Sequence, residues 1–283
     1  MTAIRFLTFL VAALVAVPLA AQPAKPATSD TYEPQPGQAG KDVIWLPTPD
    51  AMVAQMLSAA KTTSADLVFD LGSGDGKIPI AAAKTFGAKA VGIEFNPELA
   101  AFARRNVERA GVADRASIIT GDIFKEDFSK ASVVTLYLLP DLNLQLRPTL
   151  LKMKPGTRIV SHQFHMGEWQ ADETFKIEER DGYLWIVPAD VAGRWTLKEP
   201  DGTFEAQVDI TQKFQRIAGT MTRKGVTQPL LGTTINGPQL SFTFVDTDGA
   251  VRTINAKVDG NALEGRVGFV NYGTPISGAR LRP

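Results

Sequence analysis

The chain has 283 residues, which is long enough for two domains with separate hydrophobic cores. Its 30 Lys and Arg residues balance 30 Asp and Glu residues, so no broad cationic field is available to hold a nucleic-acid backbone, and we expect no nucleic-acid partner. The chain contains no cysteine, which excludes disulfides, thiolate metal sites and a lipoprotein anchor.

Residues 1–21 have the layout of a signal peptide. Arg5 precedes an apolar run from Phe6 to Val17, and small residues follow it as far as Ala21. The run is too short to span a bilayer comfortably, so we expect cleavage near Ala21, export to the periplasm and no stable membrane span afterwards. The alternative is an uncleaved segment that anchors the chain in a membrane. Residues 22–40 are rich in Pro, Ala, Gly and Gln and are expected to be a disordered linker.

The folded part is expected to begin near residue 41. The segment 43–49 is held extended by its prolines, and Thr48 or Asp50 is a candidate cap for a helix over residues 51–60. Residues 66–78 then read DLVFDLGSGDGKI, in which a short apolar strand ends on Asp70 and breaks into alternating glycines. An Ala-rich helix follows to Phe86. Strand, glycine turn and helix N-terminus together predict a nucleotide-type pocket.

The charges of this turn argue against a dinucleotide. Lys77 stands where a dinucleotide fold would place its third glycine. Asp70 and Asp75 would repel a pyrophosphate at the helix N-terminus, whereas both suit a ligand that carries positive charge. An NAD-dependent oxidoreductase is therefore disfavoured.

Two further strands end on acidic residues. Glu94 closes a strand over residues 88–94 and follows Gly72 by 22 residues (94 minus 72), the interval at which a βαβ unit brings an acid to ribose hydroxyls. Asn96 is the expected cap of the next helix, which ends at Gly111. A third strand over residues 116–119 leads into Asp122.

The run from Asp70 to Gly76 resembles motif I of the class I S-adenosylmethionine (SAM)-dependent methyltransferases. It is similar in particular to the protein-lysine methyltransferases of the mitochondrial ATP-synthase c-subunit type. The resemblance implies an α/β, Rossmann-like sheet of seven strands, SAM as cofactor, and an acid at position 122 for the adenine amino group with position 123 packing on the ring. The cofactor-binding residues predicted on this basis are Asp70, Leu71, Gly72, Ser73, Gly74, Glu94, Asp122 and Ile123.

The methyl acceptor is expected beyond the fourth strand, which starts near Ala131. Related enzymes often carry an Asn/Asp-Pro-Pro-aromatic tetrapeptide there for amine substrates, and this chain has YLLPDLN over residues 137–143 instead. The resemblance implies a protein lysine, whose amine must arrive neutral and is favoured by an apolar tunnel. Candidate walls are Trp45, Pro47, Tyr137 and Pro140, although Trp45 could equally seal the edge of the sheet. We assign no catalytic base.

The only two histidines, His162 and His165, lie at the end of the fifth strand. Acid–base work by them lacks an evident carboxylate partner, and two histidines alone do not predict a metal site. A hairpin of strands over residues 175–179 and 183–187 is expected to complete the sheet near Pro188.

From residue 191 onward the pattern is all-β. Alternating strands are predicted over residues 204–214, 216–222, 240–245, 252–258, 263–267 and 276–281, separated by regular turn signals. They predict an antiparallel barrel or sandwich, and the opening Gly193-Arg-Trp195 is similar to lipocalin-like modules. Either a filled barrel or a ligand-binding one fits this pattern.

The sequence thus predicts a methyltransferase domain over residues 41–190 and a small all-β domain over residues 191–283. The leading hypothesis is a SAM-dependent methyltransferase that acts on a protein lysine amine. The alternative is an exported ligand-binding protein in which a degenerate methyltransferase domain carries the lipocalin-like module.

Overall fold

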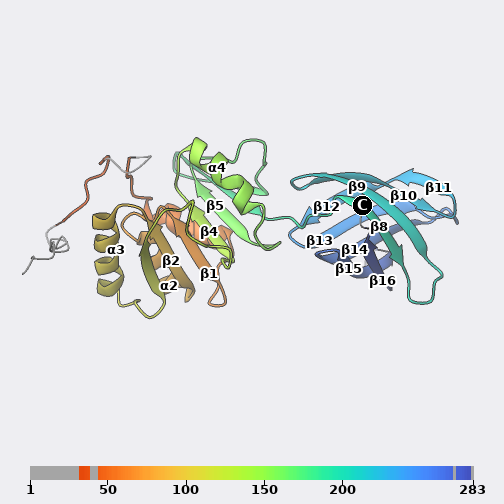
Figure 1. Ribbon diagram of the computed structural model, residues 1–283, viewed down its shortest axis with the longest axis horizontal. Coiled ribbons are helices and arrows are strands. Elements are labelled where there is room, and N and C mark those ends of the chain that lie inside the picture. The colour runs from red at the N-terminus through yellow and green to blue at the C-terminus, as the bar shows by residue number, and fades with distance from the viewer. Residues whose placement is uncertain (1–31, 39–43, 270–271, 282–283) are drawn as a thin grey trace, which may run out of the picture. The chain divides into compact units, whose positions relative to one another are not determined.

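The structure is a computed structural model that describes residues 32–38, 44–269 and 272–281 (Figure 1). The predicted signal peptide and most of the predicted linker lie outside the described residues. Two sheets account for all the strands within these ranges, and each has a hydrophobic core of its own. No helix among the described residues combines the length and apolar character needed to cross a membrane.

The first sheet has seven strands in the order β3-β2-β1-β4-β5-β7-β6. Five of them are parallel, and β7 and β6 run antiparallel at one edge, as the predicted hairpin requires. The strands are β1 Leu67–Leu71, β2 Lys89–Glu94, β3 Ala116–Thr120, β4 Val133–Leu136, β5 Arg158–His162, β6 Glu173–Ile177 and β7 Arg180–Ile186. The expected fold class is confirmed for this part of the chain.

Helices cover both faces of this sheet, which explains why its central strands β1 and β4 are largely apolar. Successive residues of β1 point to opposite sides: Val68 packs in a cluster with α1 (Asp50–Ala59), α2 (Lys77–Phe86) and α3 (Pro97–Arg109), and Phe69 packs in a second cluster with α4 (Pro140–Leu150). The carboxyl ends of the parallel strands remain uncovered by helices and form the edge at which α/β folds bind ligands.

The predicted N-terminal cap is present in α3 and absent in α1. Asn96 caps α3, because its side-chain oxygen accepts the backbone N–H groups of Glu98 and Leu99 at 2.9 and 3.2 Å. The expectation for α1 was wrong: Pro49 stands at its N-cap position and no side chain caps the helix. Thr48 contacts His162 instead.

The second sheet has nine antiparallel strands in the order β11-β10-β9-β8-β16-β15-β14-β13-β12. It is nearly closed, because its edge strands β11 and β12 follow each other in sequence and the Gln228 side chain both donates to and accepts from the Val245 backbone. The bounds are β8 Gly193–Lys198, β9 Glu205–Lys213, β10 Arg216–Arg223, β11 Val226–Pro229, β12 Leu231–Asn236, β13 Gln239–Val245, β14 Val251–Asp259, β15 Ala262–Phe269 and β16 Tyr272–Arg280. The sequence pattern had indicated six of these nine strands.

The interior of this barrel-like sheet is filled with side chains. Large buried residues include Phe204, Met221, Phe242 and Phe244. At one end, the Trp195 indole donates to the Val191 carbonyl at 2.9 Å, and the guanidinium of Arg280 lies 4.9 Å from the centre of the Trp195 ring.

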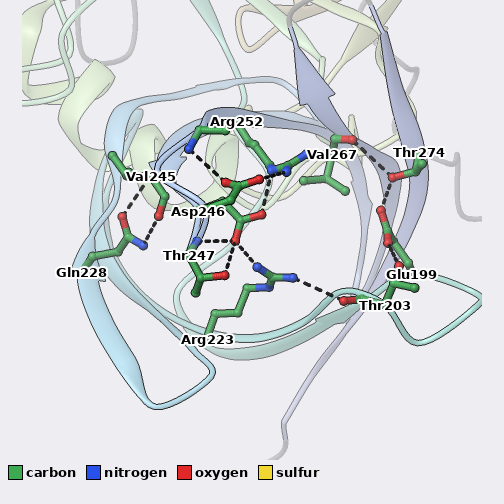
Figure 2. A network of polar contacts seen from close by, with 12 residues as sticks. Glu199, Thr203, Arg223, Gln228, Val245, Asp246, Thr247, Arg252, Val267 and Thr274 are labelled. Atoms are coloured by element: carbon green, nitrogen blue, oxygen red, sulfur yellow. Dashed lines mark hydrogen bonds and ion pairs between the residues drawn. The ribbon is translucent and has the colours of Figure 1, made fainter.

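The opposite end of the barrel carries buried charge. Figure 2 shows Asp246 inside the ring of strands, between Arg223 and Arg252. Arg223 contacts one Asp246 carboxylate oxygen, and Arg252 lies 2.7 Å from the other. Side chains fill the interior of the described barrel, and Trp195 with Arg280 at one end and Asp246 with its two arginines at the other lie across its openings. The described barrel therefore resembles a packed core more than a ligand-binding barrel.

Candidate functional site

A single pocket at the carboxyl ends of β1, β2 and β4 brings together most of the residues singled out from the sequence. Its lining includes residues that are 104 positions apart along the chain (142 minus 38), from Gln38 to Leu142. The predicted residues that line it are Trp45, Pro47, Asp70, Gly72, Ser73, Gly74, Glu94, Asp122, Ile123 and Tyr137.

The turn between β1 and α2 has three glycines that alternate with Ser73 and Asp75. Gly72, Gly74 and Gly76 have φ angles of +80°, +54° and +81°, a region that other residues rarely adopt. A Cβ atom on Gly74 would lie 2.4 Å from the Trp45 indole nitrogen, and one on Gly72 would lie 3.0 Å from Leu138. The glycines therefore let both the backbone and the segment before α1 approach the pocket closely.

Glu94, at the end of β2, is tied to this turn. One of its carboxylate oxygens accepts the backbone N–H of Gly74 and the other accepts that of Asn96, each at 2.9 Å. Burial raises the pKa of Glu94 although these hydrogen bonds oppose the rise. Two backbone hydrogen bonds thus fix the Glu94 carboxylate in the pocket lining, and its oxygens have further lone pairs that can accept hydrogen bonds from a ligand.

Asp70, at the end of β1, is the most deeply buried acid of the site. It is 3% exposed and accepts a hydrogen bond from the Thr135 hydroxyl at 2.6 Å. Burial raises the pKa of Asp70 to about 7, and the negative charges of Asp75 and Glu94 add to the rise. A cationic ligand would relieve this cost by supplying the missing opposite charge.

Two more acids complete the cluster. Asp122, after β3, accepts the backbone N–H of Phe124 at 3.0 Å. Asp75, in the glycine turn, accepts the backbone N–H of Lys77 at 3.2 Å, and burial raises its pKa. The Lys77 ammonium lies 2.8 Å from Asp50, so a neighbouring carboxylate already offsets its charge.

Tyr137, just after β4, forms the far wall of the pocket. Its ring packs on His162 with 3.9 Å between ring centroids. His165 does not line the pocket; its Nδ1 accepts the Gly167 backbone N–H at 3.0 Å in the following turn.

Two predicted site residues do not line the pocket. Leu71 is fully buried in the cluster beneath α4, because successive strand residues face opposite sides of the sheet. Pro140 is the exposed first residue of α4. Both had been inferred from neighbouring motif positions.

Other lining residues were missed as site residues from the sequence. They include Phe95, Asn96, Leu138 and Leu142. Phe95 could have been found, since it is an aromatic residue directly after the strand-end acid Glu94.

Comparisons with known proteins point to one family. Residues 70–173 match the model of the ANTKMT methyltransferase domain. A protein-lysine N-methyltransferase from Saccharolobus islandicus is 48% identical over 151 residues, which is 51% of this chain and 94% of that relative. The chain belongs to the class I SAM-dependent methyltransferases.

Other similar proteins carry different acceptor names. The mouse lysine N-methyltransferase of the ATP synthase c-subunit is 40% identical over 106 residues, covering 37% of this chain and 42% of that relative, so the chain spans less than half of its length. A crystal structure of an RNA methyltransferase from Salinibacter ruber, in complex with S-adenosyl-L-homocysteine, is 48% identical with a TM-score of 0.51, covering 52% of this chain and 96% of that one.

The cofactor of this methyltransferase is therefore SAM, and the pocket suits it. The glycine turn admits a ligand against the backbone, and the strand-end carboxylates of Asp70, Glu94 and Asp122 line the same pocket, which suits a cationic cofactor. Among the described residues, the buried Ser73 hydroxyl in the same turn has no hydrogen-bond partner. The glycine backbone, the strand-end carboxylates and the Ser73 hydroxyl are therefore available to bind the cofactor.

Proposed function

We propose that this methyltransferase acts on the side-chain amine of a protein lysine. The Saccharolobus islandicus relative, of which 94% is matched, is a protein-lysine N-methyltransferase, and the rodent, frog and human relatives are named as lysine N-methyltransferases of the ATP synthase c-subunit. The observation that carries the proposal is the pairing of this similarity with a pocket whose lining is acidic and apolar.

The charge of the pocket does not suit a polyanionic acceptor. Its described lining contains four carboxylates, from Asp70, Asp75, Glu94 and Asp122, and one lysine, Lys77, which is paired with Asp50. These carboxylates are assigned to the cofactor below, and the described lining offers neither an arginine nor an unpaired lysine to hold an RNA backbone. The RNA acceptor for which the Salinibacter ruber enzyme is named therefore fits this pocket poorly.

Within the pocket we assign the cofactor residues as follows. Glu94 holds the ribose hydroxyls, Asp122 the adenine amino group, and Ile123 with Phe95 the faces of the ring. Asp70 and Asp75 offset the positive charges of the cofactor. The glycine turn supplies backbone in contact with the cofactor, and Ser73 supplies a hydroxyl.

The bound cofactor would supply a methyl group on a sulfonium, which the acceptor nitrogen would take in line with the demethylated thioether as the leaving group, the product ammonium then losing its proton to solvent. The chain's task is to hold the acceptor nitrogen in attack geometry and keep water out. Trp45, Pro47 and Tyr137 line the pocket with largely apolar surface, which disfavours an ammonium and so favours the neutral amine that attacks. This mechanism needs no dedicated base.

The test is mass spectrometry of reaction products. The purified chain is incubated with SAM and a fraction of cellular proteins, or with total RNA in a parallel reaction, and the Asp70→Ala variant serves as the control. The proposal predicts mass increments of CH2 on lysine side chains in the protein reaction alone. Transfer to RNA, or to no protein by a chain that demonstrably binds SAM, would contradict it.

We also propose export, on the basis of residues 1–21, and two domains over residues 41–190 and 191–283. Fusing a reporter that is active only outside the cytoplasm to the C-terminus tests the first point. The rival interpretation as a ligand-binding protein with a degenerate methyltransferase domain has less support, since the pocket keeps its strand-end acids and the barrel is filled.

A further inference from the structure

Tyr137, which lines the pocket, packs against a buried histidine. His162, the last residue of β5, is 1% exposed, and its ring packs on that of Tyr137 at a tilt of 33°, with 3.9 Å between the ring centroids. Phe164 stacks on Tyr137 at a longer distance of 6.3 Å. His162 therefore supports the tyrosine ring more closely than Phe164 does.

His162 is itself held by the segment that precedes α1. The Thr48 hydroxyl and His162 Nδ1 lie 3.3 Å apart, both buried, and Thr48 lines the pocket. The other ring nitrogen, Nε2, is buried without a hydrogen-bond partner among the described residues. A side chain that only filled space would avoid this desolvation cost, so the imidazole is better explained by its contacts with Thr48 and Tyr137.

Thr48 is held on its other side by the cofactor loop. The Lys77 ammonium, at the start of α2, donates to the Thr48 carbonyl at 3.1 Å. The Lys77 backbone N–H in turn donates to Asp75 in the glycine turn. Thr48 thus joins the glycine turn, where the cofactor is expected, to the Tyr137 wall, where the acceptor is expected.

We propose that Thr48 and His162 are positioning residues for the methyl acceptor, which fix the Tyr137 wall against the cofactor loop. The inference rests on the proposed function and assigns neither residue a proton-transfer role. It predicts that loss of the Thr48–His162 contact impairs use of the acceptor and leaves cofactor binding intact.

The charge state of His162 suits this role. Burial lowers the pKa of His162 to about 4, and the positive charge of Arg180 acts in the same direction. The ring is therefore neutral at physiological pH. A cationic ring behind Tyr137 would repel both the cofactor and an approaching ammonium.

The test compares Thr48→Val, which removes the hydroxyl, with Thr48→Ser, which keeps it. Thr62→Val is the matched control, because Thr62 is also buried but its hydroxyl makes no hydrogen bond among the described residues. We expect Thr48→Val to lower kcat/KM for the acceptor by about threefold to tenfold, the value of one hydrogen bond, while the Kd for SAM changes by less than about twofold. Thr48→Ser should recover most of the loss.

Two results would overturn the inference: equal acceptor kcat/KM in Thr48→Val and Thr62→Val, or a loss of SAM affinity as large as the loss of acceptor kcat/KM. Failure of the proposed function looks different, because the wild-type chain itself then methylates no lysine. In that case nitrogen-15 NMR of the histidine rings still tests the contact between Thr48 and His162. His162 should keep one tautomer in the wild type and Thr48→Ser and lose that preference in Thr48→Val; unchanged ring shifts in Thr48→Val would refute the contact.

Discussion

The Glu94 carboxylate accepts the backbone N–H of Gly74 at 2.9 Å, which joins the end of β2 to the glycine turn after β1. A second oxygen of Glu94 accepts the Asn96 N–H, at the start of α3. One side chain therefore sets the separation between the glycine turn and the second strand end. Both of these elements line the pocket, so the Glu94 carboxylate fixes two of its walls relative to one another.

Glu94→Gln tests this relationship. Glutamine keeps the shape of the side chain but removes its charge and turns one acceptor into a donor that faces a backbone N–H. We expect SAM affinity to fall by about tenfold to a hundredfold, the range for hydrogen bonds to a charged group. Isothermal titration calorimetry measures it, with Glu98→Gln, an exposed acid in the first turn of α3, as the control. Equal affinities in the two variants would contradict the role of Glu94.

Gly74→Ala tests the glycine turn. The alanine Cβ would lie 2.4 Å from the Trp45 indole nitrogen, in addition to the cost of a positive φ angle. Gly111→Ala is the control, because Gly111 has a φ of +70° with no atom within 4 Å of the added Cβ. Both variants should lose about 1 kcal/mol of stability for the φ angle, and Gly74→Ala should lose SAM binding as well. Retained binding in Gly74→Ala would show that the turn does not contact the cofactor.

SAM affinity should depend on pH through Asp70. Burial raises the pKa of Asp70 to about 7, and a cationic cofactor binds the ionised form. Affinity should therefore rise about tenfold per pH unit below pH 7 and level off above it, with release of a proton on binding. Calorimetry in buffers of different ionisation enthalpy measures the proton, and Asp70→Asn should abolish both effects. A flat profile in the wild type would rule out Asp70 as the titrating group.

The same shift predicts a pH dependence of stability in the absence of cofactor. The folded-state pKa of Asp70, about 7, lies above its ordinary value of 3.8. Its contribution to stability is therefore complete below about pH 3.8 and is lost as the pH rises through 7. Urea unfolding of wild type and Asp70→Asn at several pH values should show the wild type losing stability relative to the variant over this window. The opposite trend would mean that Asp70 is ionised and well solvated in the folded chain.

The buried charges of the barrel should matter for stability. Arg223 and Asp246 are each 9% exposed, and Asp246 also lies 2.7 Å from Arg252. Asp246→Ala leaves Arg223 buried without an opposite charge and should cost about 3–5 kcal/mol of unfolding free energy. Asp248→Ala, which removes an exposed partner of Arg252, should have little effect. Similar denaturation midpoints for the two variants would show that the Arg223–Asp246 pair is not needed.

The barrel should be dispensable for cofactor binding. The Saccharolobus islandicus relative is matched over 94% of its length by 151 residues, which leaves no room in it for a second nine-stranded sheet. A chain truncated after Ala189 should fold and bind SAM with the affinity of the full chain. A truncated chain that keeps its helical circular dichroism but binds no SAM would mean that the barrel contributes to the site.

The sequence was most informative where an acid or a glycine ends a strand, because such positions are set by local chemistry. Asp70, Glu94 and Asp122 were located in this way. Contacts between segments distant in sequence left no such pattern: nothing in the sequence places Thr48 beside His162, 114 residues away. The strands at 226–229 and 231–236 also escaped notice, since few of their residues are buried and the alternation is weak. Motif membership also did not reveal that the Leu71 side chain faces the buried cluster rather than the pocket.

The central claim is that the strand-end acids around the glycine turn form a working SAM site, and calorimetric titration of SAM tests it most directly. The account predicts binding to the wild-type chain at one site, and no detectable binding to Asp70→Ala or Glu94→Ala chains whose circular dichroism spectra show a retained fold. Unchanged affinity in both folded variants would contradict it.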